Sequence, residues 1–442
     1  MFFVLMGCFM DRVIHVTEEQ RTHSAYRSGN RVPGMKVAAL CLLLLPFAAP
    51  GIAAAQGISL AQALDAAFAR NPELAAAQWE IGVAEGDRQQ AGLIPNPVVS
   101  WEVEDTRRET STTTVMLSQA LELGGKRGAR IEAASKGQDA ARLEVERRGN
   151  ELRAEVVQAF YAAAWAQAGL DLARQSRTLA ERGLQVAEGR VRAGKVSPVE
   201  ATRAQVQLAE TDVLVRRAET LKINSNRELA RTTGSPVASF ERLEYTDLSP
   251  GKLPQSTKLL SAINQSAELR LAQAQIEQRE AALGSERAKR IPDLTVSVGS
   301  QYSREERERV NVVGLSMPLP LFDRNQGNVL AASRRADQSR DLRNAVELKL
   351  RTQTQSALDQ WSTAAQEVES FNQVILPAAQ RAVDTATRGF EMGKFGFLEV
   401  LDAQRTLISA RSQYLESLAT ATEARVAVER IHGDLNRFSL NP

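Results

Sequence analysis

The chain contains the same stretch twice, at residues 194–234 and at residues 393–433. At a constant shift of 199 positions the two copies share eight residues, which in the first copy are Gly194, Lys195, Glu200, Ala204, Gln205, Leu208, Arg231 and Gly234. Each copy begins with a glycine turn, continues as an amphipathic helix and ends at a glycine. A long repeat of this kind predicts a tandem duplication in which each unit ends in a helical arm.

The first 55 residues have the order of an export signal. Met35 and Lys36 form a charged start, residues 37–49 are apolar, and residues 53–55 are alanines that suit a cleavage site. We expect cleavage near Gln56, with Met35 as the true start. The apolar run is shorter than the ~18 residues that a membrane-spanning helix needs, which disfavours an anchor. Cys41 is a poor lipidation site because Leu40 precedes it.

Removal of this segment changes the chemistry that the chain can carry. Both cysteines and two of the three histidines lie in residues 1–55, and the rest of the chain has 50 basic and 50 acidic residues. A neutral, thiol-free chain excludes disulfides and thiolate metal sites and argues against nucleic acid as a partner. No Ser/His/Asp set, phosphate loop or ligand cluster is evident. The sequence therefore predicts neither an enzyme nor a bound cofactor, and His432 is interpreted as the end of a helix.

The first unit, residues 56–234, begins with helical signals and then changes to a period of two. A capping box at Ser59 opens a short helix, which breaks at Asn71 and resumes as far as Gly92. Two alternating segments around Trp101 and Leu117 predict a pair of strands of about ten residues, the length that crosses a bilayer when tilted.

After that hairpin, no proline occurs from residue 124 until Pro198. One helix up to Ala193 would be roughly 100 Å long at ~1.5 Å per residue. The chain then turns at residues 194–196. A return helix follows, with Ser197 as its cap and Glu200 at its third position. Together these segments predict a very long helical hairpin.

The second unit, residues 256–434, repeats this order after an irregular connection at 235–255 and leaves a tail at 435–442. We expect a helix over 256–289, a strand from Leu294, a charged turn over 303–309 and a strand over 313–321. The second long helix is expected at 325–392, with a kink at Pro377, and its return arm at 393–433.

Four predicted strands cannot close a barrel, for which about eight are needed, and an open sheet would expose its edges. Several copies must therefore share one barrel. Two adjacent seven-residue seams in the second arm, one through Leu401 and one through Leu407, suit a helix packed on both sides, as in a tube of helices. The alternatives to a barrel continued by a tube of helices are a periplasmic coiled-coil scaffold and a trimeric adhesin.

The chain resembles the TolC-type outer-membrane efflux proteins over nearly its whole length after residue 55. The resemblance is carried by the duplicated order of elements and by the tip segment Gly393-Lys394-Phe395-Gly396-Phe397-Leu398-Glu399-Val400-Leu401-Asp402-Ala403-Gln404. Residues 121–127, Leu-Glu-Leu-Gly-Gly-Lys-Arg, resemble the heavy-metal cation branch typified by CzcC, while a duct for drugs or secreted proteins stays open as an alternative.

The resemblance implies a mostly α-helical homotrimer with four transmembrane strands per subunit, which form one β-barrel continuous with an α-helical tunnel in the periplasm. It implies an exit duct in the outer membrane of a Gram-negative bacterium, in contact with lipid. Its partners would be a periplasmic adaptor, or membrane fusion protein, and an inner-membrane pump of the RND type.

Three groups of residues are candidates for this function. Glu399 and Asp402 share one helix face and, in a trimer, would form acidic rings at the periplasmic mouth, where carboxylates favour cations. The alternative is that Glu399 only caps the helix and that Asp402 is a solvated surface charge. In the first copy Arg203 replaces the second acid. The resemblance implies adaptor contacts at the two tips, which carry Gly194, Lys195, Gly393 and Lys394. The polar strand face would line the barrel lumen, and its acidic residues are Glu102, Glu104 and Glu122.

Overall fold

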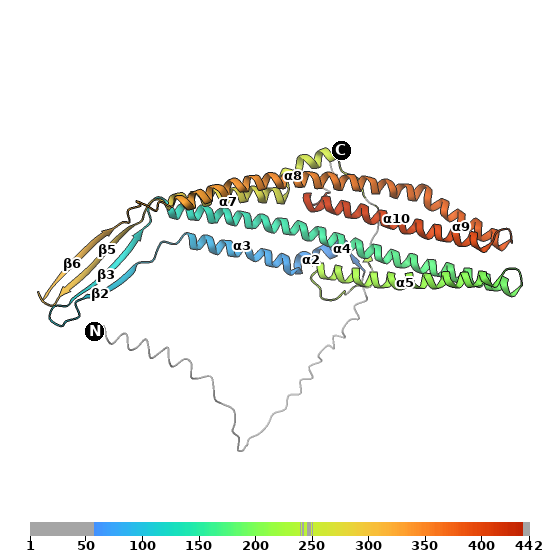
Figure 1. Cartoon of the computed structure of the whole chain (residues 1–442), viewed down its shortest axis with the longest axis horizontal. Coiled ribbons are helices and arrows are strands. Elements are labelled where there is room, and N and C mark those ends of the chain that lie inside the picture. Colours follow the sequence, from blue (N-terminus) through green and yellow to red (C-terminus); the bar gives the residue numbers. More distant parts are fainter. Residues whose placement is uncertain (1–56, 239, 241–242, 245–248, 250, 436–442) are drawn as a thin grey trace, which may run out of the picture. The chain divides into compact units, whose positions relative to one another are not determined.

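A computed structural model describes residues 57–435, apart from 239, 241–242, 245–248 and 250. The expected export signal and both cysteines lie outside these residues, as does the tail after Leu435. Within them, one order of elements occurs twice (Figure 1). The first copy contains β1 (Ile58–Ser59), α2 (Leu60–Arg70), α3 (Pro72–Ala91), β2 (Val98–Glu104), β3 (Thr112–Leu121), α4 (Lys126–Arg192) and α5 (Pro198–Thr232).

The second copy follows the connection that holds β4 (Leu243–Glu244). It contains α6 (Ser256–Ala262), a 3₁₀ turn η1 (Ile263–Gln265), α7 (Ala267–Ala288), β5 (Leu294–Ser303), β6 (Glu308–Ser316), α8 (Gln326–Ser370), a π-helical turn η2 (Phe371–Ile375), α9 (Leu376–Glu391) and α10 (Phe397–His432). Among the described residues, no helix has the length and apolarity needed to span a membrane.

The two long helices confirm the predictions from proline and glycine placement. Helix α4 runs for 67 residues without interruption, although it contains six glycines, at positions 128, 137, 149, 169, 183 and 189. The second long helix is interrupted where Pro377 was expected to kink it, because η2 precedes α9 and Pro377 lies in the first turn of α9. Both return helices end at glycines with positive φ, Gly234 at 72° and Gly433 at 74°, a region that non-glycine residues rarely adopt.

The helix signals predicted near residues 59 and 71 are confirmed. Ser59 forms a reciprocal capping box with Gln62 at the start of α2. Asn71 caps α3, accepting hydrogen bonds from the backbone N–H of Glu73 at 2.9 Å and of Leu74 at 3.1 Å. Its amide nitrogen donates to the carbonyl of Thr232 at 3.1 Å in a buried position, so this cap also attaches the end of α5.

We expect Asn71→Ala to lower the free energy of unfolding by about 2 kcal/mol, since it removes both a cap and a buried hydrogen bond. Thermal unfolding followed by circular dichroism measures the change. Asn344→Ala is the control, because Asn344 lies on an exposed face of α8 and its side chain accepts a hydrogen bond from the neighbouring Arg343 at 3.3 Å. Equal melting temperatures for the two variants would contradict this role of Asn71.

Several predictions about the bounds of the elements were wrong. The helix expected over 256–289 is broken by η1, and Ser266 caps a new helix by accepting from Leu269 N–H at 3.3 Å. The strand expected over 313–321 is β6, which starts at Glu308 and ends at Ser316, because the prolines at 318 and 320 have no N–H for the ladder. The connection at 235–255 is not wholly irregular, since β4 pairs in parallel with β1.

The strands form one antiparallel sheet in the order β2-β3-β5-β6. Strand β2 has seven residues rather than about ten, while β3 and β5 each have ten. Leu117 is opposite Val99 on one side and Val298 on the other, so these apolar side chains share a face. Residues 105–111 and 304–307 connect the strands at the far end of the sheet.

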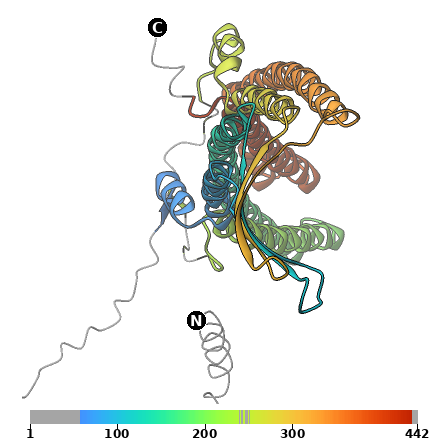
Figure 2. The ribbon, with the colours of Figure 1, turned by 90° about the vertical axis from the view of Figure 1, so that its left-hand side faces the viewer.

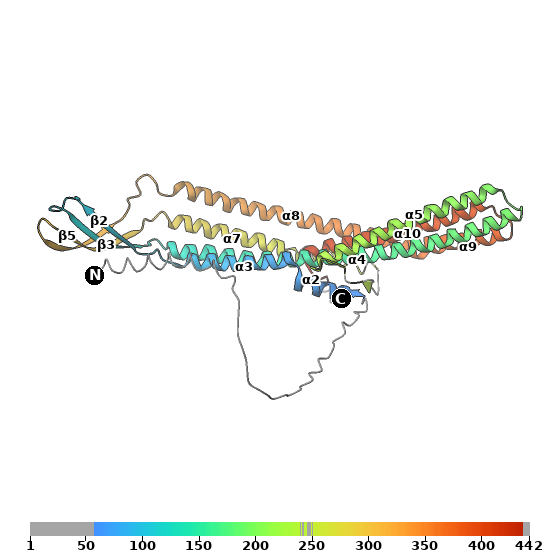
Figure 3. The same ribbon diagram turned by 90° about the horizontal axis from the view of Figure 1, so that it is seen from below.

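Four helices continue the sheet in the same order. Helix α3 packs on α4, α4 on α7, and α7 on α8 (Figures 2 and 3). Ion pairs connect these neighbours, including Lys136 with Glu277 at 2.7 Å between α4 and α7, and Arg340 with Glu280 at 2.6 Å between α8 and α7. At the opposite end, α4 with α5 and α9 with α10 form two helical hairpins (Figure 1).

Candidate functional site

The two hairpin tips have the same backbone turn. Gly194 and Gly393 adopt φ values of 68° and 75°, and each N–H bonds to a carbonyl in the last helical turn at 2.9 Å. The following lysine N–H reaches back to Arg190 at the first tip and to Gly389 at the second. This is the Schellman arrangement. Lys195 and Lys394 are exposed, and both tips would need glycine whether or not a partner binds there.

Contacts between the two hairpins lie close to their tips. Arg190, at the end of α4, donates from Nη1 to the carbonyl of Phe390 at 2.9 Å, and its guanidinium lies 4.3 Å from the centroid of that ring. Phe390 in turn packs on Phe397, with ring centroids 5.5 Å apart. A cation held by both a carbonyl and an aromatic face joins the ends of α4 and α9. The sequence analysis did not identify Arg190, whose partner is 200 positions away.

The acidic pair lies on the first turns of α10, where both Glu399 and Asp402 are exposed. Glu399 borders a hollow of about 420 Å³ together with Phe395 and Arg381. Its Oε2 atom lies over the N-cap residue Gly396, where an added Cβ would come within 2.8 Å of it. The structure therefore places both carboxylates on one exposed helix face, directly after the second tip.

The equivalent face of the first copy is different. Ser197 caps α5 by accepting from Val199 N–H at 3.4 Å, but the reciprocal bond expected from Glu200 is absent. Instead the Oε2 atom of Glu200 is buried without a hydrogen-bond partner among the described residues, and Arg203 is exposed. The two copies thus present different charges near their tips.

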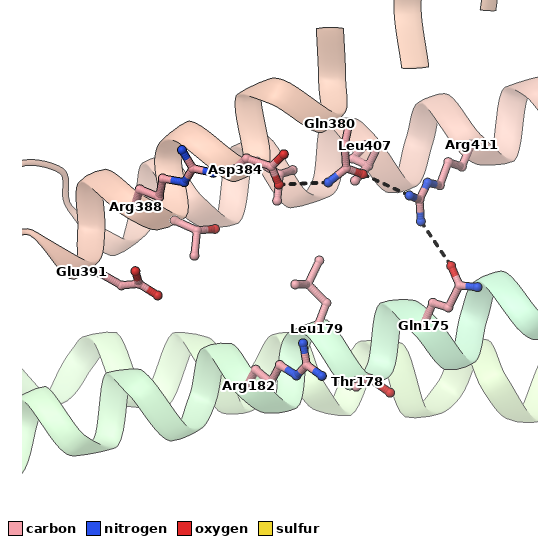
Figure 4. A pocket seen from close by; sticks show the side chains of 12 residues that line it. Gln175, Thr178, Leu179, Arg182, Gln380, Asp384, Arg388, Glu391, Leu407 and Arg411 are labelled. Atoms are coloured by element: carbon pink, nitrogen blue, oxygen red, sulfur yellow. Dashed lines mark hydrogen bonds between the residues drawn. The ribbon is translucent and has the colours of Figure 1, made fainter. Parts of the chain in front are cut away.

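A hollow of about 620 Å³ separates the hairpins farther from the tips (Figure 4). Side chains of both signs line it, with Arg182 on α4 and Asp384, Arg388 and Glu391 on α9. At one end Arg411 closes it by donating to Gln380 at 3.1 Å and to Gln175 at 3.3 Å.

The hinge-like turn η2 lies close to this hollow along α8 and α9. Its π-helical bond runs from Leu376 N–H to the carbonyl of Phe371, and Pro377 supplies no N–H at the next position. Such turns are points where a helix changes direction. Arg190 and Arg411 therefore connect the α9–α10 hairpin to α4 on the tip side of η2.

The lumen candidates fall into two groups. Glu102 and Glu104 lie on β2 with exposed side chains, opposite Thr114 and Thr112 of β3. Glu122 follows the end of β3 and forms an ion pair with Arg130 of α4. The pair neutralises Glu122 at the base of the sheet, so its local environment differs from that of the two β2 carboxylates.

His432 is the last residue of α10, as interpreted from the sequence, and it is buried against α8. Its Nε2 atom lies 3.2 Å from the hydroxyl of Thr354. Burial lowers the pKa of His432 to about 4, because the charged imidazolium loses its hydration. Among the described residues, no group of three or more His, Cys, Asp or Glu side chains could hold a metal ion.

This pKa predicts a pH dependence of stability. The unfolded chain binds a proton at His432 near pH 6.5, whereas the folded chain binds it near pH 4, so stability should fall as the pH decreases between these values. Melting temperatures from pH 7 to 4 should therefore fall less in His432→Gln than in the parent. Identical pH profiles for the two proteins would contradict the assignment of this loss of stability to His432.

Comparison with known proteins agrees with this architecture. The model of the family "Outer membrane efflux protein" matches residues 63–235 and again 259–434. The chain is 37% identical over 381 residues to the cobalt-zinc-cadmium resistance protein CzcC of Cupriavidus metallidurans, covering 86% of this chain and 91% of that protein. It is 26% identical over 351 residues to the nickel-cobalt-cadmium resistance protein NccC of Alcaligenes xylosoxydans xylosoxydans, covering 77% and 79% of the two chains.

A solved structure has the same fold at lower sequence identity. The outer-membrane channel OprN superposes with a TM-score of 0.73 at 19% identity, over 85% of this chain and 90% of that chain. The chain therefore shares the fold of that structure, including its arrangement of sheet, helical layer and hairpins.

Proposed function

Because this chain belongs to the family of outer membrane efflux proteins, we propose that it is the exit duct of a tripartite system that exports heavy-metal cations. In this proposal three copies form the duct, a periplasmic adaptor contacts the hairpin tips, and an inner-membrane pump of the RND type supplies the energy. Membership of this family sets aside the scaffold and adhesin alternatives.

The observation that carries the proposal is the exposed apolar face of the sheet. Val99, Trp101, Val313 and Leu315 lie on this face, each at least 70% exposed. The opposite face carries Glu102 and threonines. A sheet with one apolar and one polar exposed face suits a wall between lipid and a water-filled lumen. Three copies would supply twelve strands, enough to close around such a lumen.

Metal cations are proposed as the substrate class on two grounds. The relatives CzcC and NccC are named for resistance to cobalt, zinc, cadmium and nickel. In addition, Glu399 and Asp402 are exposed side by side near the end of the second hairpin, and three copies would bring six carboxylates to one mouth. Rings of carboxylates attract cations and slow anions. Gly194, Lys195, Gly393 and Lys394 are proposed as the surface that meets the adaptor.

The gate of this duct is proposed to be the α9–α10 hairpin. Arg190 and Arg411 hold it against α4, and η2 allows it to bend when those contacts break. The hollow of about 620 Å³ between the hairpins leaves room for that motion. Glu102 and Glu104 would then face the lumen at the other end of the duct.

Deletion of the gene tests the substrate class. The deletion strain should become more sensitive to zinc, cobalt and cadmium, and the intact gene should restore tolerance. Organic drugs and copper, tested in parallel, should show a smaller change. Increased sensitivity to drugs alone would reject metal cations and leave the duct itself in place.

A further inference from the structure

The four connections between strands and long helices lie where the sheet meets the helical layer (Figure 1). Together with the adjoining helix ends they form a region that we call the junction. It comprises residues 92–97, 122–130, 286–293 and 317–325. The four segments come from distant parts of the sequence, so their side chains combine into a surface that no single segment shows.

The apolar face of the sheet continues into the junction. The alternation of β6 carries on beyond Ser316, the last residue of that strand, through Met317, Leu319 and Leu321, which are 47%, 72% and 65% exposed. Phe322 follows and is 90% exposed. An exposed apolar surface of this extent indicates contact with a partner or a membrane. The apolar surface therefore extends farther toward the helices than the strand ladder does.

Basic residues outnumber acidic residues in the junction by seven to four, although the chain after residue 55 is balanced. Three of the carboxylates are in ion pairs: Glu122 with Arg130, Asp293 with Lys126 at 2.7 Å, and Glu286 with Lys289 at 2.6 Å. Four exposed arginines have no carboxylate partner among the described residues: Arg127, Arg287, Arg290 and Arg324. We call these four the junction arginines, and the one carboxylate of the junction outside those ion pairs is Asp323.

Helix electrostatics does not explain two of the junction arginines. Arg127 lies in the first turn of α4, and Arg324 lies two residues before the start of α8. The start of a helix carries a partial positive charge, which disfavours a cation there. Neither helix has an acidic residue in its first turn. Within one copy, the positive charges of these two arginines are therefore not offset among the described residues.

The same two arginines are held at the border of the apolar surface. The Nε atom of Arg127 donates to the carbonyl of Gly92 at 2.6 Å, directly before the exposed Leu93. The Nη2 atom of Arg324 lies 3.5 Å from the carbonyl of Leu321. A guanidinium beside apolar side chains can bind a phosphate group while the hydrocarbon attached to that phosphate stays on the apolar side.

We propose that the junction binds anionic phospholipid. The junction arginines receive the headgroup phosphates, and the acyl chains cover residues 317–322. The inference rests on the proposed function, a duct in the outer membrane, and it adds the class of lipid and the residues that select it. Clusters of basic residues beside a membrane attract anionic lipids in this way.

A phospholipid is favoured over free phosphate and over another copy of the chain. Free phosphate would leave Leu319, Leu321 and Phe322 exposed to water. Another copy brings the same excess of arginine, so its junction cannot neutralise this one. An anionic phospholipid supplies both the negative charge and the hydrocarbon that this surface lacks.

Competition between two lipids tests the site. The full-length protein is extracted in detergent, freed of lipid and mixed with equal amounts of phosphatidylglycerol and phosphatidylethanolamine, and native mass spectrometry counts the lipids that it retains. The parent should retain phosphatidylglycerol in preference. Arg287→Gln with Arg290→Gln should retain about tenfold less of it, because two phosphate-binding charges are lost from each copy while the retention of phosphatidylethanolamine stays the same.

Arg216→Gln with Arg217→Gln is the matched control. Both arginines are exposed on α5, away from the junction, so this variant loses the same charge and should bind lipid as the parent does. Three results would overturn the inference: no lipid preference in the parent, equal retention of phosphatidylglycerol by the two double variants, or its complete displacement by inorganic phosphate.

The state of the parent protein separates this failure from that of the proposed function. An outer-membrane trimer that shows no preference between the two lipids rejects the lipid site and leaves the duct in place. A soluble periplasmic monomer rejects both.

A further variant tests the apolar half of the site. Phe322→Ser removes a side chain that is 90% exposed, so the fold does not depend on it. It should lower the retention of both lipids about threefold through the lost apolar contact, while the preference for phosphatidylglycerol persists. Val237→Ser is the control, since Val237 is 69% exposed on the connection between the two repeats. Equal lipid retention by these two variants would reject the acyl-chain contact.

Discussion

Leu117→Arg should abolish assembly in the outer membrane. Leu117 lies near the middle of β3, between Val99 and Val298 on the apolar face of the sheet. An arginine on the lipid side near the bilayer midplane costs about 2–4 kcal/mol, and the cost recurs in every copy of a trimer. The trimer seen on unheated gels of outer-membrane fractions should therefore be nearly absent.

Thr114→Arg is the matched control for this result. Thr114 belongs to the same strand but lies on the other face, opposite Glu102 on β2 and Gln301 on β5. An arginine there enters the polar side next to a carboxylate, so assembly should persist. If both variants assembled equally well, the assignment of the two sheet faces would be wrong.

Neutralising the acidic pair should weaken the block of the duct by divalent cations by about tenfold. Glu399→Gln with Asp402→Asn keeps the size of both side chains and removes six negative charges from a trimeric mouth. Charges held near one another in a narrow opening interact by several kcal/mol at an effective dielectric of about 20, so their loss should also change the conductance. Single-channel recording in planar bilayers, with zinc added on the side of the tips, measures both effects.

Arg203→Gln is the matched control for the variant of the acidic pair. Arg203 is the equivalent of Asp402 in the first copy, and it is exposed. Its loss removes a positive charge and should leave divalent block as strong as in the parent. Unchanged block in the Glu399/Asp402 variant would reject the proposed selectivity site, although not the duct.

Much of the fold could be predicted because local signals coincide with the boundaries of its elements. The capping box at Ser59, the cap at Asn71 and the terminal glycines at 234 and 433 all act over one helical turn, so a sequence shows them directly. The uninterrupted length of α4 follows in the same way from the absence of proline.

Features that depend on distant partners could not be predicted. The break at η1 has no proline, and Ile263 is buried there in a cluster with Leu269 of α7 and Leu350 of α8. The pairing of β1 with β4 joins segments almost 200 positions apart. The prolines at 318 and 320, in contrast, were present in the sequence and should have ended the predicted strand at Ser316.

The candidate site was predicted in its charges but not in its contacts. Glu399 and Asp402 are recognisable from their spacing and from the resemblance of the tip. Arg190 donates to a backbone carbonyl of α9, and Arg411 donates to glutamine side chains of α4 and α9. No periodic pattern in the sequence identifies such contacts between distant helices. The asymmetry between the copies was visible in Arg203, whereas the buried oxygen of Glu200 was not.

The size of the complex extracted from the outer membrane tests the central claim most directly. If three copies close one duct, the detergent-extracted protein should have three times the chain mass after correction for detergent, and heating should convert it to a single chain on gels. Recovery of the protein as a monomer in the soluble periplasmic fraction would contradict the account.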